Sequence, residues 1–250
     1  MHEDVLPKHR LDLLNHSRLA DYTDELAANL SPSRRVVYKQ VGGRDLHLNL
    51  FEPPDLQPGD RRPCFLSIHG GGWTSLGPHR QYPTAAHFAA RGMIGMSLEY
   101  RLVTPASGTT VFDCVRDARS AMRYLRTHAE ELCIDPRKIV TQGGSAGGHL
   151  AVGTALFDGI DEAGEDASVS CAPQALVLFF PVIDTSAGGF GHARLGNDWR
   201  TLSPLHRVRP GGPPTLLFHG TGDTVTPFPG ARAFRDAMIR AGNECELVVN

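Results

Sequence analysis

Hydrophobic and polar residues alternate in two neighbouring segments near the beginning of the chain. Residues 36–41 and 45–51 flank a short connection that contains two glycines, and Leu46, Leu48 and Leu50 fall on one face of the second segment. Alternation with a period of two is typical of a strand with one buried face, and a short Gly-containing connection is typical of a hairpin. The pattern therefore predicts an antiparallel hairpin.

Beyond this hairpin, short apolar runs alternate with segments of helical periodicity. The runs are typical of buried strands and cover residues 64–68, 92–100, 139–142, 175–180, 215–219 and 245–249. Helical spacing marks residues 82–91, 112–132 and 230–241, and a helix-compatible run also follows the third apolar run. This order predicts an α/β fold with a mostly parallel central sheet and helices on both faces.

The chain divides into a short extension and one domain. Residues 1–34 are polar with intermittent leucines, which predicts one or two short amphipathic helices. They could cover a pocket mouth, but a simple surface extension is the favoured interpretation. Residues 35–250 contain no repeat and no linker, and a chain of 250 residues suffices for a single α/β domain with a large core.

Composition and charge exclude several classes of function. A net charge of −2 gives no electrostatic reason to expect nucleic acid or an anionic membrane as partner. No apolar run approaches the roughly 20 residues of a spanning helix, and the first residues do not resemble a signal peptide. The five cysteines are odd in number and lack C-x-x-C spacing, which indicates free thiols and favours a cytoplasmic location. The 12 histidines form no metal-binding pair, so we expect no metal centre.

Candidate chemistry begins at a Gly-x-Ser-x-Gly motif formed by Gly143, Ser145 and Gly147. An apolar run precedes it and a helix-compatible run follows, which is the pattern of a nucleophile elbow. In such a turn the serine has a strained backbone, and its hydroxyl stands clear of the sheet. The glycines are needed because the chain approaches itself closely across the turn. An incidental serine in a Gly-rich loop is the alternative.

A second motif could stabilise the oxyanion that acyl transfer generates. The segment His-Gly-Gly-Gly-Trp begins at His69 and follows an apolar run. Residues without side chains can turn their N–H groups toward a substrate, so we expect Gly71 and Gly72 to donate together with Ala146, at the N-terminus of a helix. We expect His69 to anchor the loop and Trp73 to form a pocket wall.

Asp223 is the favoured catalytic acid. It lies in the turn that leaves the apolar run 215–219, where a carboxylate could orient an imidazole. Its position after the serine also follows the chain order of α/β-hydrolases. Asp184, which likewise follows an apolar run, is the second candidate, and both could be ordinary turn-forming aspartates.

These motifs resemble the α/β-hydrolase esterase/lipase family, in particular its acetyl-esterase-like branch with an HGGGW oxyanion loop. The similarity covers residues 35–250, and its most specific segments are 69–73, 143–151 and 219–227. The resemblance implies an α/β-hydrolase fold that needs no cofactor and acts on a small-molecule or carbohydrate ester. It assigns Ser145 as nucleophile, Asp223 as acid, and Gly71, Gly72 and Ala146 as the oxyanion hole. It also implies a histidine base in the loop after the last strand.

That histidine is not found where the resemblance places it. The sequence ends at Asn250, in or just after the last predicted strand. His149 should pack against the helix that follows the elbow, and His219 precedes the acid, so His206 is the one tolerable substitute. We therefore expect the domain to continue beyond Asn250 and to carry the histidine there. A chain that ends at Asn250 should be a poor esterase, because loss of a triad member costs factors of about 10⁴ to 10⁶.

The sequence thus predicts a serine carboxylesterase that acts on short acyl esters, including acetyl groups on sugars. One alternative is an amidase or peptidase on the same fold, of the prolyl-oligopeptidase or kynurenine-formamidase kind. Another is a catalytically silent binding protein, which the missing histidine alone supports. Resemblance of fold does not choose among the many esters that such enzymes hydrolyse.

Overall fold

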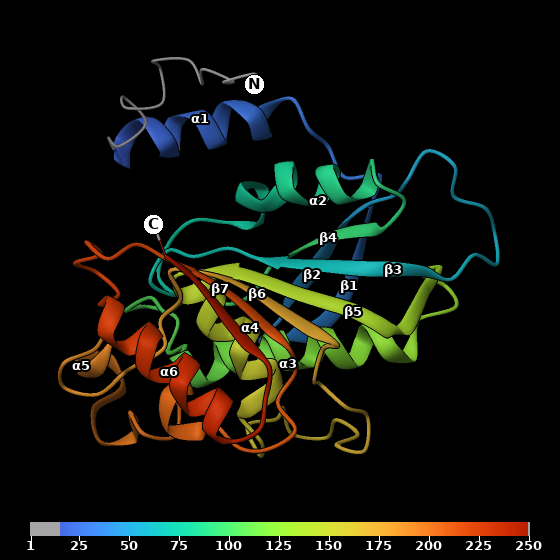
Figure 1. Cartoon of the computed structure of the whole chain (residues 1–250). Helices are drawn as coiled ribbons and strands as arrows, with labels where there is room; N and C mark the ends of the chain where they lie inside the picture. Colours follow the sequence, from blue (N-terminus) through green and yellow to red (C-terminus); the bar gives the residue numbers. More distant parts are fainter. Residues whose placement is uncertain (1–15, 250) are drawn as a thin grey trace, which may run out of the picture.

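The computed structural model describes residues 16–249 and has one eight-stranded sheet at its centre (Figure 1). The strand order is β1-β2-β4-β3-β5-β6-β7-β8, antiparallel from β1 through β2 to β4 and parallel elsewhere. The strands are β1 (Arg34–Val41), β2 (Arg44–Phe51), β3 (Arg62–Ile68), β4 (Ile94–Leu98), β5 (Ile134–Gly144), β6 (Ala175–Phe179), β7 (Thr215–His219) and β8 (Cys245–Val249). The predicted hairpin and the predicted mostly parallel sheet are both confirmed.

Helices cover both faces of the sheet, as predicted. In Figure 1, α1 and α2 lie on one side, and α3, α4 and α6 lie on the other. The helices and short helical turns are α1 (His16–Ala28), η3 (Pro78–Gln81), α2 (Tyr82–Ala89), α3 (Val111–Thr127), α4 (Ala146–Leu156), α5 (His192–Leu195), η4 (Gly196–Asp198), η5 (Pro204–Arg207) and α6 (Phe228–Arg240). Helix α1 packs on α2 and η3 and is the described part of the predicted N-terminal extension, since residues 1–15 lie outside the described residues.

Strand β2 is more buried than its alternating sequence suggests. Leu46, Leu48 and Leu50 have no exposed surface, as predicted, but Asn49 on the opposite face is also 1% exposed. The reason is that α2 covers this second face: the Tyr82 hydroxyl donates to Asn49 Oδ1 at 3.1 Å. The Asn49 side-chain amide in turn donates to the backbone of β4. A polar residue therefore occupies a buried position because its hydrogen bonds are supplied by neighbours.

Helix α3 ends at Thr127, five residues before the end of its predicted range. The chain then turns back, with Ile134 N–H donating to Ala129 C=O at 2.9 Å and Cys133 at a positive φ of 53°. This turn brings Cys133 C=O to the N–H of Arg62, at the start of β3. The apolar periodicity continues past the helix because the turn residues also pack against the core.

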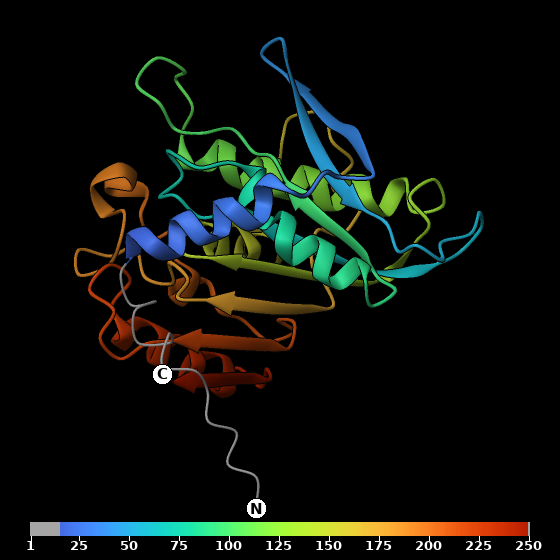
Figure 2. The same ribbon diagram turned by 90° about the horizontal axis from the view of Figure 1, so that it is seen from above.

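Strands β6 and β7 bury one face more fully than the other. Leu176, Leu178 and Leu217 have almost no exposed surface, whereas alternate residues such as Phe179 and Phe218 are half-buried and stack with ring centroids 5.0 Å apart. On the side of the sheet where α2 lies, no helix of the described residues covers β6, β7 and β8 (Figure 2). The apolar core is thus densest between the sheet and α3, α4 and α6.

We predict that Gly95→Ala destabilises the protein by about 3 kcal/mol. Gly95 lies in β4 against α2, and a Cβ there would stand 2.0 Å from the carbonyl oxygen of Ala85, so one of two packed elements must move. Urea unfolding measures the effect. Gly222→Ala is the control, because a Cβ there meets nothing within 4 Å; equal stability of the two variants would contradict the packing argument.

Candidate active site

Ser145 occupies the sharp turn between β5 and α4. Its backbone has φ 52° and ψ −122°, a conformation that residues with side chains rarely adopt. Three hydrogen bonds hold it there: Ser145 N–H donates to Phe179 C=O at 3.0 Å, and Ser145 C=O accepts from Val182 N–H at 3.0 Å and His149 N–H at 3.1 Å. The structure therefore has the strained strand–helix corner that the sequence predicts.

Glycines around Ser145 permit close contacts between backbones. A Cβ on Gly143 would lie 2.3 Å from the carbonyl carbon of Gly147, which confirms the predicted approach across the turn. A Cβ on Gly147 would instead lie 2.2 Å from Ile68 C=O, at the end of β3. Gly148, which the sequence analysis did not single out, packs against Pro181, where a Cβ would come within 2.6 Å of the proline side chain.

The tri-glycine loop, residues 69–73 with three consecutive glycines, lies directly against Ser145. A Cβ on Gly70 would stand 3.4 Å from Ser145 Cβ and 3.0 Å from Gly144 C=O. Gly71 and Gly72 have φ of 98° and 58°, which glycine adopts without strain. The N–H groups of both glycines donate to no other group of the described residues. Ala146 is the first residue of α4, so its N–H has no intrahelical acceptor.

Two other residues of this loop are buried. His69 is 1% exposed, its Nδ1 lies 2.9 Å from Gly70 C=O and its ring stacks on Tyr100, so it anchors the loop as predicted. Burial lowers the pKa of His69 to about 4. Trp73 has no exposed surface and packs between His149 and Phe190. That Trp73 forms a pocket wall stays a prediction; Phe190, which Trp73 contacts, lines the cavity described below.

Asp223 lies in a turn that holds its carboxylate in place. Oδ1 accepts from Val225 N–H and Thr226 N–H, each at 2.8 Å, and Oδ2 accepts from the Thr226 hydroxyl at 2.8 Å. Burial raises the pKa of Asp223, but the hydrogen bonds from Thr226 and Val225 outweigh it, so the pKa lies below its ordinary value. The carboxylate is therefore ionised at neutral pH.

The turn that contains Asp223 is connected to the elbow. The Thr226 hydroxyl, which donates to Asp223 Oδ2, also lies 3.1 Å from Phe180 C=O, and Phe180 directly follows the residue whose carbonyl accepts from Ser145 N–H. Asp184, the second candidate acid, lies two residues after Val182, whose N–H donates to Ser145 C=O, and its Oδ1 accepts from Ser186 N–H at 2.8 Å within its own turn. That Asp223 is the acid therefore stays a prediction, with Asp184 as the second candidate.

The described histidines do not provide a base for Ser145. His149 is fully buried on α4, with Nε2 2.7 Å from Leu202 C=O, and burial lowers its pKa to about 4. His219 ends β7, where its Nε2 lies 2.6 Å from Thr226 C=O. His206 is exposed in η5, with Nδ1 2.9 Å from the Ser203 hydroxyl. Within residues 22–249, no histidine hydrogen-bonds to Ser145.

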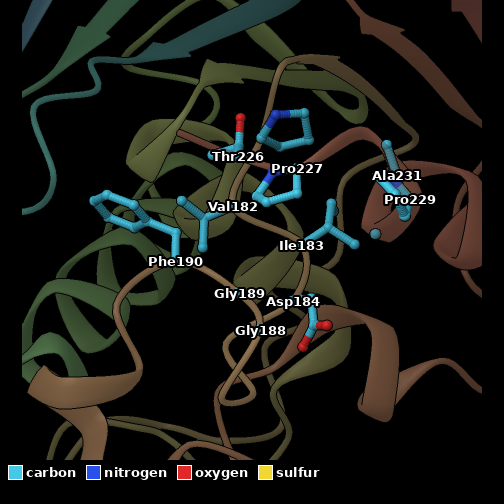
Figure 3. A pocket seen from close by; sticks show the side chains of 12 residues that line it. Val182, Ile183, Asp184, Gly188, Gly189, Phe190, Thr226, Pro227, Pro229 and Ala231 are labelled. Atoms are coloured by element: carbon cyan, nitrogen blue, oxygen red, sulfur yellow. The ribbon is translucent and has the colours of Figure 1, made fainter. Parts of the chain in front are cut away.

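A cavity of about 200 Å³ lies near Ser145, the tri-glycine loop and the Asp223 turn (Figure 3). Three of its lining residues are connected to the candidate site. Val182 N–H donates to Ser145 C=O, and Phe190 lies 3.5 Å from where a Cβ on Gly72 would stand. Thr226 belongs to the turn that contains Asp223. The other lining residues are mostly small or apolar: Pro181, Ile183, Asp184, Gly188, Gly189, Pro227, Pro229, Gly230 and Ala231. The cavity is therefore lined by neighbours of the candidate components, while Ser145, Gly71, Gly72, Ala146 and Asp223 do not line it themselves.

The described residues also lack two other features. They contain no group of three His, Cys, Asp or Glu side chains that could hold a metal ion. None of their helices is long and apolar enough to cross a membrane. All five cysteines are free.

Comparison with known proteins points to esterases. A family model described as BD-FAE matches residues 48–238. "Esterase LipQ" of Mycobacterium tuberculosis (strain ATCC 25618 / H37Rv) is 30% identical over 224 residues, which cover 80% of this chain and 51% of LipQ. "Probable carboxylic ester hydrolase LipM" of the same organism is 30% identical over 227 residues, or 81% of this chain and 51% of LipM. The chain thus spans about half the length of these curated relatives.

Solved structures of one esterase are similar over most of the chain. The apo form of Thermogutta terrifontis esterase 2 is 42% identical with a TM-score of 0.83, covering 89% of this chain and 84% of that one. Other structures of the same esterase are described as phosphorylated by paraoxon, propionate-bound and butyrate-bound. The likeness confirms the α/β-hydrolase fold.

We predict that Asp223→Asn lowers the free energy of unfolding by about 1 kcal/mol at pH 7, because it weakens charge-assisted hydrogen bonds. A carboxylate whose pKa is lowered by folding stabilises the protein above its unfolded pKa of about 3.9 and loses that effect as pH falls through the folded pKa. The difference between wild type and variant should therefore vanish in acid, which urea unfolding at pH 3 to 7 can follow. The exposed Asp198→Asn is the control; a difference at Asp223 that is independent of pH would contradict the argument.

Proposed function

The chain belongs to the BD-FAE family of α/β-hydrolase esterases, and on this basis we propose that it is a serine carboxylesterase for short acyl esters. The observation that carries the proposal is the contact between the tri-glycine loop and the strained Ser145. A serine hydroxyl and unpaired backbone N–H groups at one place are what acyl transfer requires. Neither a metal nor a cofactor takes part in this chemistry.

In the proposed reaction, Ser145 Oγ bonds to the ester carbonyl carbon while a base takes the hydroxyl proton. The carbonyl oxygen gains the electron pair and accepts hydrogen bonds from the N–H groups of Gly71, Gly72 and Ala146, each worth about 3–4 kcal/mol in the transition state. Collapse expels the alcohol, which takes up the proton from the base. Water then attacks the acyl-enzyme in the same way and releases the carboxylic acid and the free serine.

The proposed base is a histidine carried by the chain that follows β8. In the parallel ladder of β7 and β8, Val249 pairs with His219, so β8 ends level with the strand that leads into the Asp223 turn. A histidine shortly after β8 can reach both this carboxylate and the elbow. Asp223 would accept from one ring nitrogen and keep the other free to take the proton from Ser145.

The proposed acyl site is the cavity of about 200 Å³ that is lined by Val182, whose N–H donates to Ser145 C=O. Its lining is mostly apolar, with Val182, Phe190 and Pro227 around it in Figure 3, and its small volume suits a short chain. The propionate- and butyrate-bound structures of the similar esterase support short carboxylates as products. Acetyl esters of carbohydrates belong to the same proposed class.

We predict that paraoxon transfers one diethylphosphoryl group to the natural full-length protein and none to Ser145→Ala. The bond from Ser145 Oγ to phosphorus forms as p-nitrophenolate leaves, and intact-mass spectrometry detects the adduct. The same substitution should lower kcat for p-nitrophenyl butyrate by about 10⁴- to 10⁶-fold.

His206→Ala is the control for this experiment and should keep both the adduct and the activity, because His206 is exposed and bonds to Ser203. Labelling of Ser145→Ala at the wild-type rate would refute the nucleophile. Loss of activity in His206→Ala would assign the base to that residue instead.

We predict that kcat/KM is highest for acetate and butyrate esters and at least about tenfold lower for octanoate, since each misfit methylene costs about 1–3 kcal/mol. Phe190→Ala should enlarge the cavity and raise kcat/KM for the octanoate ester relative to kcat/KM for the butyrate ester. A series of p-nitrophenyl esters measures both effects. Octanoate preference in the wild type would remove the short-acyl proposal and leave the esterase proposal intact.

A further inference from the structure

The direction of an N–H group in the tri-glycine loop is set by the carbonyl of the preceding residue. A peptide unit is planar and trans, so its C=O and N–H point in opposite directions and turn together. Gly70 C=O therefore determines where Gly71 N–H points, and Gly71 C=O does the same for Gly72 N–H. Glycine–glycine peptides have little steric preference of their own, so other groups must hold these carbonyls.

The second of these carbonyls is held by its own loop. Gly71 C=O accepts from Thr74 N–H at 3.0 Å and Ser75 N–H at 3.1 Å. The hydroxyls of Ser75 and Thr74 add further contacts at 3.0 and 3.3 Å. Two backbone donors remain whichever side chain is removed, so the peptide that presents Gly72 N–H is stable without help from elsewhere.

The first carbonyl depends on side chains instead. In the described residues no backbone N–H donates to Gly70 C=O. Its two donors are the Tyr100 hydroxyl at 3.1 Å and His69 Nδ1 at 2.9 Å. The Tyr100 hydroxyl shares its one proton between Gly70 C=O and His69 C=O, which lies 3.0 Å away, and its ring stacks on His69 with centroids 4.3 Å apart. Because Nδ1 faces a carbonyl, the neutral His69 carries its proton on that nitrogen.

Tyr100 can act as a fixed support because its own segment is pinned. The residue is 1% exposed and follows β4. Its neighbour Arg101 donates to both carboxylate oxygens of the fully buried Asp117 on α3, with contacts of 2.7 to 3.1 Å. Two residues further, Val103 N–H donates to Trp73 C=O at 2.8 Å. The segment is thus fixed at one end to α3 and at the other to the tri-glycine loop.

We propose that Tyr100, together with His69, is a positioning residue that aims Gly71 N–H at the oxyanion by holding Gly70 C=O. The inference rests on the proposed function of the loop. The Tyr100 hydroxyl contacts His69 and Gly70, and Tyr100 acts through the peptide unit between Gly70 and Gly71. Without its hydroxyl, only His69 Nδ1 holds the carbonyl, and the N–H is correctly aimed for a smaller fraction of the time.

Tyr100→Phe in the natural full-length protein tests the proposal, because it removes the hydroxyl and keeps the ring that stacks on His69. Loss of a whole oxyanion donor costs about 10²–10³ in kcat, so a loosened donor should cost about tenfold, with KM within about twofold. Affinity for a trifluoromethyl ketone, whose tetrahedral adduct places an oxyanion in the site, should fall by the same factor as kcat/KM.

Tyr38→Phe is the matched control. Tyr38 is also a buried tyrosine whose hydroxyl donates to a backbone carbonyl, that of Glu99 at 2.7 Å, next to Tyr100 in the chain. Its loss should cost similar stability in urea unfolding but leave kcat and the ketone affinity unchanged. Ser75→Ala should also keep nearly full activity, since two backbone donors still hold Gly71 C=O.

The outcomes separate this inference from the proposed function. A selective loss of kcat and ketone affinity in Tyr100→Phe supports the inference. Wild-type kcat in Tyr100→Phe, or equal losses in Tyr100→Phe and Tyr38→Phe, overturns it while Ser145→Ala still tests the esterase. If the wild type hydrolyses no ester, or if its hydrolysis persists in Ser145→Ala, the proposed function is overturned and this inference with it.

Discussion

The backbone conformation of Ser145 is the constraint on which the arrangement of the candidate site depends. A positive φ at the end of β5 turns the chain into α4 within one residue, and this is possible only where glycines allow backbones to meet. Gly147 then packs on the end of β3, which brings the tri-glycine loop beside the serine. The carbonyl of Phe179 completes the connection by binding Ser145 N–H. Three strands thus meet at one corner.

Much of the fold could be predicted because its signals are local. Strand β7 coincides with the predicted residues 215–219, and the hairpin of β1 and β2 follows from alternation and two glycines. The end of α3 was missed because the turn after Thr127 buries its apolar residues as a helix would. Buried Asn49 was missed because its partners, Tyr82 and Ser97, lie on other elements. Burial that depends on distant hydrogen-bond partners leaves no local pattern.

The same distinction applies to the site. Motifs of a few residues, such as Gly-x-Ser-x-Gly, were sufficient to predict the elbow, and the resemblance to a family supplied the roles of Asp223 and the glycines. The supporting role of Tyr100 was not predicted, because Tyr100 reaches Gly70 across 30 positions of the chain. A tyrosine after a strand gives no sign in sequence of the carbonyl it will bind. The sequence-based assignment of roles to Ser145, Asp223 and the three N–H groups stays a prediction.

Most residues with a strained backbone conformation lie beyond the carboxyl ends of the parallel strands. Of the five non-glycine residues with positive φ among the described residues, Trp73, Leu76, Ser145 and Phe180 belong to the loops that surround the elbow. Each such conformation costs of order 1–3 kcal/mol, which the rest of the fold must offset. A glycine in place of the serine would remove both this cost and the nucleophile. Selection for heat resistance alone would therefore tend to discard catalysis, and laboratory evolution of this scaffold needs activity in every round of screening.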